Sequence, residues 1–172
     1  MMNASIISSL DKKLLSYHDI SLRLLCKEDL AQLALSLRRQ DRSEIWAAYR
    51  LPVEDVLEKC YQKSSIALAL FYRGKICGAA GVEADSLLGA RGCVWSWTGK
   101  GVEQSPKKFW QVSKEVLRYF LSIYPQLYAL CDVRYRQAQR YLLRLGACKQ
   151  EGKIHLAGKE TVFELYQFQR PC

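Results

Sequence analysis

The segment Gly92–Phe120 constrains the fold most, because it joins an apolar strand to an amphipathic helix through a glycine turn. The run Gly92–Trp97, rich in Val and Trp, is typical of a buried strand. Ser105 is a suitable N-cap and Pro106 suits the first helical position, so we expect a helix from Pro106 onward. The apolar residues of that helix recur at helical spacing: Phe109, Val112, Val116, Phe120 and Ile123.

The turn of this unit, Thr98-Gly99-Lys100-Gly101, has an arrangement in which proteins hold phosphates. Backbone amides at a helix N-terminus attract anions, and Lys107 and Lys108 stand in the first helical turn. Because the helix dipole disfavours cations there, the two lysines favour an anion nearby. A solvated turn with two exposed lysines explains the same residues equally well, so both interpretations stay open.

The composition is that of one globular domain with an excess of positive charge. A chain of 172 residues suits a single domain with a sizeable core. The 26 Lys and Arg against 17 Asp and Glu give a net charge of +9, which favours acidic partners such as a nucleotide cofactor. Nucleic acid is allowed by this charge, but no recognition motif supports it. We expect residues 1–18 to be an N-terminal extension and residues 19–172 to form the domain.

The seven cysteines form neither a metal motif nor a redox motif. No pair has CxxC spacing, and His18 and His155 are far apart, so we expect no metal site. Several cysteines lie in apolar runs, where Cys behaves as a small hydrophobe. The first residues do not form a secretory signal, and no apolar stretch approaches the length of a membrane span. These features favour a reduced, cytoplasmic setting.

Apolar periodicity predicts an α/β domain with a mixed sheet and the order β-α-α-β-β-β-α-β-α-β-β. The expected strands are Ile20–Leu25, Ser65–Tyr72, Ile76–Glu83, Gly92–Trp97, Gln126–Cys131, Cys148–His155 and Thr161–Phe168. The expected helices include Lys27–Leu37, Val53–Gln62, Pro106–Ile123 and Arg134–Leu145. We predict that Gly92–Trp97 and Gln126–Cys131 are neighbouring parallel strands, because Pro106–Ile123 can form the crossover between them.

Asp41 and Glu44 stand three residues apart, directly before Ile45. This spacing matches a capping box with Asp in place of Ser or Thr, so a helix cap is one interpretation. The other is a polar pair that faces a cleft, in which Glu44 acts as a base and Asp41 orients it. The last predicted helix poses a similar choice, because its arginines form either a solvated stripe or an anion-binding patch: Arg136, Arg140 and Arg144.

The order of elements resembles the GNAT fold, the Gcn5-related N-acetyltransferases, over about residues 20–168. In that family a Q/R-x-x-G-x-G/A loop binds the pyrophosphate of acetyl-CoA through its backbone amides. The matching stretch is Ser96–Gly101, in which both glycines are present and Ser96 replaces the leading Gln or Arg. The resemblance implies an acetyl-CoA site formed by Trp97, Thr98, Gly99, Lys100, Gly101, Lys107 and Lys108.

A second GNAT motif places an Asn, a Tyr that often serves as general acid, and Gly-Phe along the last helix. Here Tyr135 stands at the Asn position and Leu142 at the Tyr position, followed by Gly146-Ala147. Tyr141 is one residue away from the Tyr position, which turns its side chain about 100° around the helix. Pro106 also delays the start of the central helix, since it does not fit deep inside one.

Within this fold, the chain resembles a phage-borne branch typified by the internal virion protein A of T7-like phages. The segments that carry the resemblance are Leu37–Ala47, Leu87–Gly89, Trp95–Gly99, Phe109, Tyr124–Leu127, Asp132 and Arg140–Gly146. It implies a protein that acts through partners such as other virion proteins, in the cytoplasm or inside the virion, with weak or lost acetyltransferase activity. The alternative is an active acetyl-CoA-dependent N-acetyltransferase, with Glu44 as base and Cys131 as a weaker nucleophile candidate. An open groove between the two parallel strands would favour this alternative.

Overall fold

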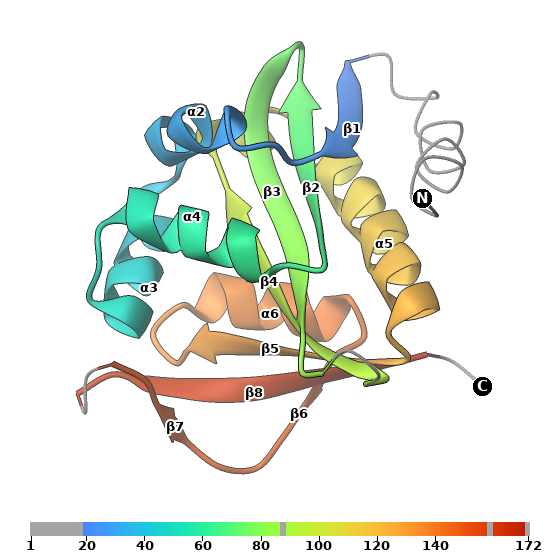
Figure 1. Cartoon of the computed structure of the whole chain (residues 1–172). Helices are drawn as coiled ribbons and strands as arrows, with labels where there is room; N and C mark the ends of the chain where they lie inside the picture. The colour runs from blue at the N-terminus through green and yellow to red at the C-terminus, as the bar shows by residue number, and fades with distance from the viewer. Residues whose placement is uncertain (1–18, 87–88, 158–159, 171–172) are drawn as a thin grey trace.

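The structure is a computed structural model that describes residues 19–86, 89–157 and 160–170 (Figure 1). Within these residues, eight strands form one mixed sheet in the order β1-β2-β3-β4-β5-β8-β6, and β7 also pairs with β8. The strands are β1 (Ile20–Leu24), β2 (Ile66–Tyr72), β3 (Lys75–Ala84), β4 (Arg91–Thr98), β5 (Gln126–Asp132), β6 (Cys148–Lys149), β7 (Ile154–His155) and β8 (Val162–Gln169). The predicted mixed α/β sheet is confirmed, whereas the expected extension 1–18 lies outside the described residues.

Helices cover both faces of this sheet (Figure 1). They are α2 (Asp29–Ser36), α3 (Arg39–Tyr49), α4 (Val53–Lys63), α5 (Pro106–Ile123) and α6 (Arg136–Arg144), with a 3₁₀ helix η1 (Lys100–Gln104) before α5. One apolar core lies between the sheet and α5, with α6 packed against it. A second core lies between the sheet and α2, α3 and α4. The alternation of β4 divides its side chains between the two, so Val94 packs with the first core while Trp95 and Trp97 belong to the second.

The central unit forms as its sequence predicts. The strands β4 and β5 are parallel neighbours, and α5 connects them. Pro106 is the first residue of α5, as expected, and Val112, Val116 and Phe120 on its apolar face are buried. The loop that Pro106 forces ahead of the helix is taken up by η1.

The structure excludes the capping-box interpretation, bears out the Ser105 cap in position only, and contradicts one predicted strand. The helix α3 begins at Arg39 and has no side-chain cap, so Asp41 and Glu44 do not form a capping box. Ser105 occupies the N-cap position of α5 but makes no side-chain capping hydrogen bond. The expected strand Cys148–His155 is two short strands, β6 and β7, separated by a turn in which Gly152 has a positive φ of 111°.

Candidate functional site

The two parallel strands diverge after a short paired stretch, and a large cavity lies between them. Pairing runs only from Arg91–Gln126 to Cys93–Tyr128. Beyond these residues β4 continues to pair with β3, and β5 with β8. The cavity has a volume of about 1190 Å³ and is lined by both strands and by α3, α5 and α6. The groove that the sequence left undecided is therefore open.

The helix α3 lies where β4 and β5 have diverged, and it contacts both strands through Asp41 and Glu44. An Asp41 carboxylate oxygen accepts a hydrogen bond from the backbone amide of Thr98, the last residue of β4, at 3.0 Å. Glu44 Oε1 accepts one from the backbone amide of Asp132, the last residue of β5, at 2.9 Å. Two carboxylates less than one helical turn apart thus hold the ends of two diverging strands.

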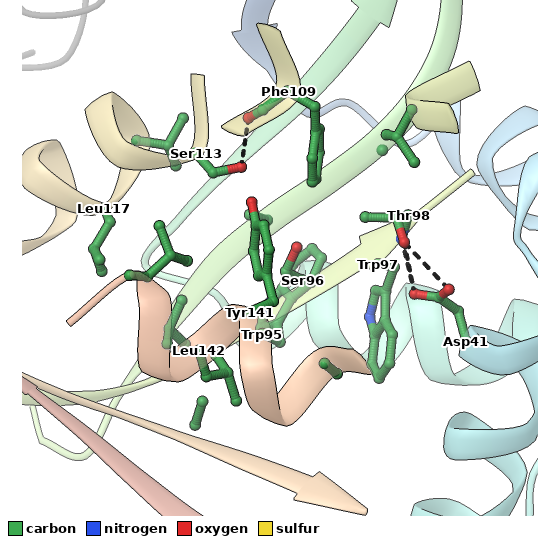
Figure 2. A pocket seen from close by; sticks show the side chains of 18 of the residues that line it. Asp41, Trp95, Ser96, Trp97, Thr98, Phe109, Ser113, Leu117, Tyr141 and Leu142 are labelled. Carbon is green, nitrogen blue, oxygen red and sulfur yellow. Dashed lines mark hydrogen bonds between the residues drawn. The ribbon is translucent and has the colours of Figure 1, made fainter. Parts of the chain in front are cut away.

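Asp41 is the more deeply buried of the pair, with 3% of its surface exposed. Its carboxylate also accepts a hydrogen bond from the Thr98 hydroxyl at 3.0 Å (Figure 2). A further hydrogen bond comes from Arg38 Nε at 3.0 Å. The Arg38 guanidinium in turn donates to the hydroxyl of Tyr135, just before α6, at 2.7 Å. Asp41 is therefore an anchor that connects α3, β4 and the start of α6.

Glu44 lies at the boundary between the cavity and the surface, because it lines both the cavity and a neighbouring open groove. Burial raises the pKa of its carboxyl to about 7, and the negative charges of Asp41 and Asp132 add to this rise. A carboxyl with such a pKa exchanges a proton at neutral pH, which is what a general base requires. Burial and the adjacent Glu44 raise the pKa of the Cys131 thiol, so the structure argues against Cys131 as a nucleophile.

The turn expected to bind phosphate is packed into the protein. The Thr98 amide is bonded to Asp41, and the Gly99 amide donates to the carbonyl of Cys77 at 2.8 Å. A Cβ atom at Gly99 would lie 2.7 Å from the Ser36 hydroxyl oxygen, and one at Gly101 would lie 2.7 Å from Cys77 Cβ. Both glycines are thus required by close packing against α2 and β3.

Of the other residues expected to hold the cofactor, Trp97 and Lys107 line the cavity, whereas Lys100 and Lys108 do not. The Trp97 side chain stacks on Trp95 in the core beneath α2 and α4, on the opposite side of β4 from Ser96 (Figure 2). Lys108 Nζ forms an ion pair with Asp19 Oδ1 at 2.6 Å. Lys107 lines the cavity, whereas Lys100 is exposed at the start of η1.

The structure brings further residues to the cavity that the sequence did not assign. Tyr141 of α6 reaches across to α5, where its ring stacks on that of Phe109 with the ring centroids 5.8 Å apart (Figure 2). It also meets the Trp110 ring edge-on at 5.4 Å. Burial raises the pKa of the Tyr141 hydroxyl to about 12. The cations that line the cavity from α5 and α6 are Lys107, Lys114, Arg140 and Arg144. The sequence indicated two of these cations, Arg140 and Arg144, through the repeated arginines of the last predicted helix.

These four cations have no carboxylate partner among the described residues, since no ion pair there includes them. Likewise, no cluster of three or more His, Cys, Asp or Glu in the described ranges could hold a metal ion. None of the described helices is long and apolar enough to cross a membrane. The site is therefore a cavity that attracts anions.

Comparison with known proteins identifies the fold. No family model matches the sequence, and no curated protein matches it. An acetyltransferase of the GNAT family from Streptococcus pneumoniae superposes with a TM-score of 0.62 at 19% identity, covering 88% of this chain and 99% of that one. The ribosomal L7/L12 α-N-protein acetyltransferase RimL, solved with coenzyme A, gives 0.66 at 12% identity, covering 88% and 94%.

A third similar structure is the microcin C7 self-immunity acetyltransferase MccE in complex with acetyl-CoA and AMP. It gives a TM-score of 0.65 at 16% identity and covers 88% of this chain and 93% of its own. At these identities the likeness concerns the fold, and the chain has the fold of the GNAT acetyltransferases. The predicted fold class is thereby confirmed.

Proposed function

We propose that this protein is an N-acyltransferase that uses an acyl-CoA donor. The observation that carries the proposal is the cavity between β4 and β5, which extends from the cations of α5 and α6 to the carboxyl of Glu44. A fold shared with acetyltransferases does not establish activity. An open cavity that ends at a group able to exchange a proton near neutral pH supports it directly.

The edge of β4 and the cations of α5 and α6 suit the amides and the phosphates of an acyl-CoA. The backbone edge of Val94–Trp97, which faces the cavity without a neighbouring strand, suits an extended chain of amides. Lys107, Lys114, Arg140 and Arg144 would hold the phosphates by charge. The turn at Gly99 contributes less than the family motif implies, because the Thr98 and Gly99 amides are bonded inside the protein.

The chemistry of the chain's own groups follows from their pKa values. When bound, an acyl-CoA supplies an acyl group activated as a thioester. Glu44, with a pKa of about 7, is the residue that takes the proton of an acceptor amine. Asp41 positions α3 by its bonds to Thr98 and Arg38 and is therefore a positioning residue. The Tyr141 hydroxyl keeps its proton at neutral pH and is available as a donor inside the cavity.

A second candidate is a GNAT-fold protein with weak or lost activity that acts through partners, as the resemblance to phage internal virion proteins implies. One observation favours it. The contact of Tyr141 with Phe109 joins α6 to α5 across the cavity (Figure 2). A second ring contact joins Tyr141 to Trp110. An acyl-CoA that passes between α5 and α6 has to displace the Tyr141 ring. The lost aromatic contacts lower the affinity of the protein for the acyl-CoA.

Calorimetric titration with acetyl-CoA separates the two candidates. Binding that depends on side-chain cations is screened by salt, so we expect binding at low ionic strength that weakens severalfold near ~0.15 M. Arg140→Glu should abolish it, whereas Lys75→Glu, an equal charge change at the exposed first residue of β3, should leave it unchanged. Absence of binding at low salt would refute the acyltransferase and leave the partner-dependent protein.

A further inference from the structure

A basic groove runs along the outer face of α3, on the far side of Glu44 from the cavity. It has a volume of about 820 Å³ and lies between α3 and the segment Asp132–Tyr135. The residues Arg39, Ser43, Trp46 and Arg50 line it at spacings of four, three and four, so they form one stripe along the helix. The stripe extends about 16 Å from Arg39 to Arg50, at 1.5 Å per residue.

The charges of this groove are incompletely balanced. Arg39 and Arg42 form no ion pair with any carboxylate in the described ranges, and the Arg42 guanidinium donates to the carbonyl of Ala34. Arg50 lies 4.0 Å from Glu160, whose side chain is 91% exposed, so this pair contributes little. By contrast, the Arg134 guanidinium is neutralised by Asp132 at 2.5 Å. Three cations are therefore available to a ligand, two on α3 and Arg50 directly after it.

An exposed aromatic side chain lies in the middle of the stripe. Trp46 is 54% exposed, although a large aromatic residue on a helix is usually turned into a core. The Arg50 guanidinium lies 5.7 Å from its ring. An exposed Trp beside Arg is the composition of a binding hot spot.

We infer that this groove binds an acidic peptide segment and presents its free amino terminus to Glu44. The occupant is a peptide because the stripe matches four or five extended residues at roughly 3.3 Å each, more than a small amine would span. It is acidic because Arg39, Arg42 and Arg50 line the groove. The inference rests on the proposed acyltransferase only for the fate of the amine, since the groove and its charges stand without it.

The test uses two synthetic pentapeptides with free amino termini, one carrying three Asp or Glu residues and the other their Asn or Gln counterparts. Each carries a fluorophore at its carboxyl end, and binding to the full chain is measured by anisotropy without acetyl-CoA. We expect the acidic peptide to bind at least about tenfold more tightly, given roughly two- to fivefold for each exposed charge pair. Arg39→Gln should reduce this preference about threefold, and Trp46→Ala should weaken both peptides. Lys75→Glu is the control for net charge.

Equal affinity for the two peptides, or no effect of Arg39→Gln, would overturn the inference. Binding of glutamate or phosphoethanolamine as tight as that of the acidic peptide would also overturn it, because a small anion would then be the natural occupant. The same peptides are then offered with acetyl-CoA, and acetylation is followed by mass spectrometry. If the acidic peptide binds but is never acetylated, the groove assignment stands and the proposed acyltransferase fails. If both peptides are acetylated without preference for the acidic one, the proposed acyltransferase stands and the groove assignment fails.

Discussion

The substitution Glu44→Gln tests the assignment of Glu44 through the dependence of folding stability on pH. Its carboxyl has a pKa of about 7 in the folded protein, against an ordinary value of 4.5. The folded state therefore binds the proton more tightly than the unfolded state. The stabilisation from this proton is fully present below about pH 4.5 and is lost as the pH rises through about 7. The difference corresponds to about 3 kcal/mol at roughly 1.4 kcal/mol per pH unit.

Glutamine keeps the shape of the side chain and the acceptor for the Asp132 amide, but it has no charge to bury. We expect the variant and the parent to unfold with similar free energies near pH 4.5. Above about pH 8 the variant should be more stable by up to about 3 kcal/mol. Urea unfolding at several pH values measures this difference, and all other titrating groups cancel in the comparison. Glu54→Gln, the same chemical change on an exposed residue of α4, is the matched control.

The same variant should lose transferase activity while keeping its affinity for acetyl-CoA, since Glu44 is needed for the amine proton. Parallel stability curves for parent and variant would show that the folded pKa is not raised and would refute the reasoning. A variant that is less stable at pH 8 would mean that the ionised carboxylate stabilises the fold through the Asp132 amide, which would make Glu44 a structural residue. Stabilisation together with lost activity is the signature of a functional group held at the expense of stability.

Three further outcomes follow from the same contacts. Asp41→Ala should reduce the free energy of unfolding by about 3–5 kcal/mol in urea, because it leaves the Arg38 charge and the Thr98 amide without their buried partner; a loss near 1 kcal/mol would match a simple helix cap. Gly99→Val should lower the melting temperature even without ligand, because its Cβ collides with Ser36, and an unchanged melting temperature would mean that the turn adapts. Tyr141→Phe should leave calorimetric acetyl-CoA binding intact but reduce kcat by about 100-fold if the hydroxyl donates a proton; unchanged turnover would remove Tyr141 from the chemistry.

The parts of the fold that local patterns determine could be predicted from the sequence. Helical spacing of apolar residues located α5, and Pro106 set its first residue. The crossover rule then placed β4 beside β5, as the structure confirms. The divergence of these strands after Cys93 had no signal in the sequence, because each strand remains paired with its other neighbour.

The roles of single polar residues were less predictable, because their partners are distant in sequence. Asp41 bonds to Thr98, which is 57 positions away, and Glu44 bonds to Asp132, which is 88 positions away. The capping-box spacing predicted only a local role for Asp41 and Glu44, as a helix cap. In the structure both side chains bond to residues distant in the sequence instead. The glycines of the turn illustrate a different difficulty. Their pattern matches a phosphate loop, but the structure needs glycine at these positions because the backbone packs closely against Ser36 and Cys77.

The two carboxylates of α3 separate into an anchor and a candidate base because their surroundings differ, although they leave the helix only three residues apart. Asp41 is surrounded by donors, namely the Thr98 amide and hydroxyl and the Arg38 guanidinium. Glu44 has the Asp132 amide, but it also faces the charges of Asp41 and Asp132, and no ion pair among the described residues includes it. The same helix therefore holds the ends of β4 and β5 apart and places the carboxyl with the raised pKa in the opening between them. Because Glu44 and Tyr135 line both the cavity and the basic groove, the two sites meet at these residues.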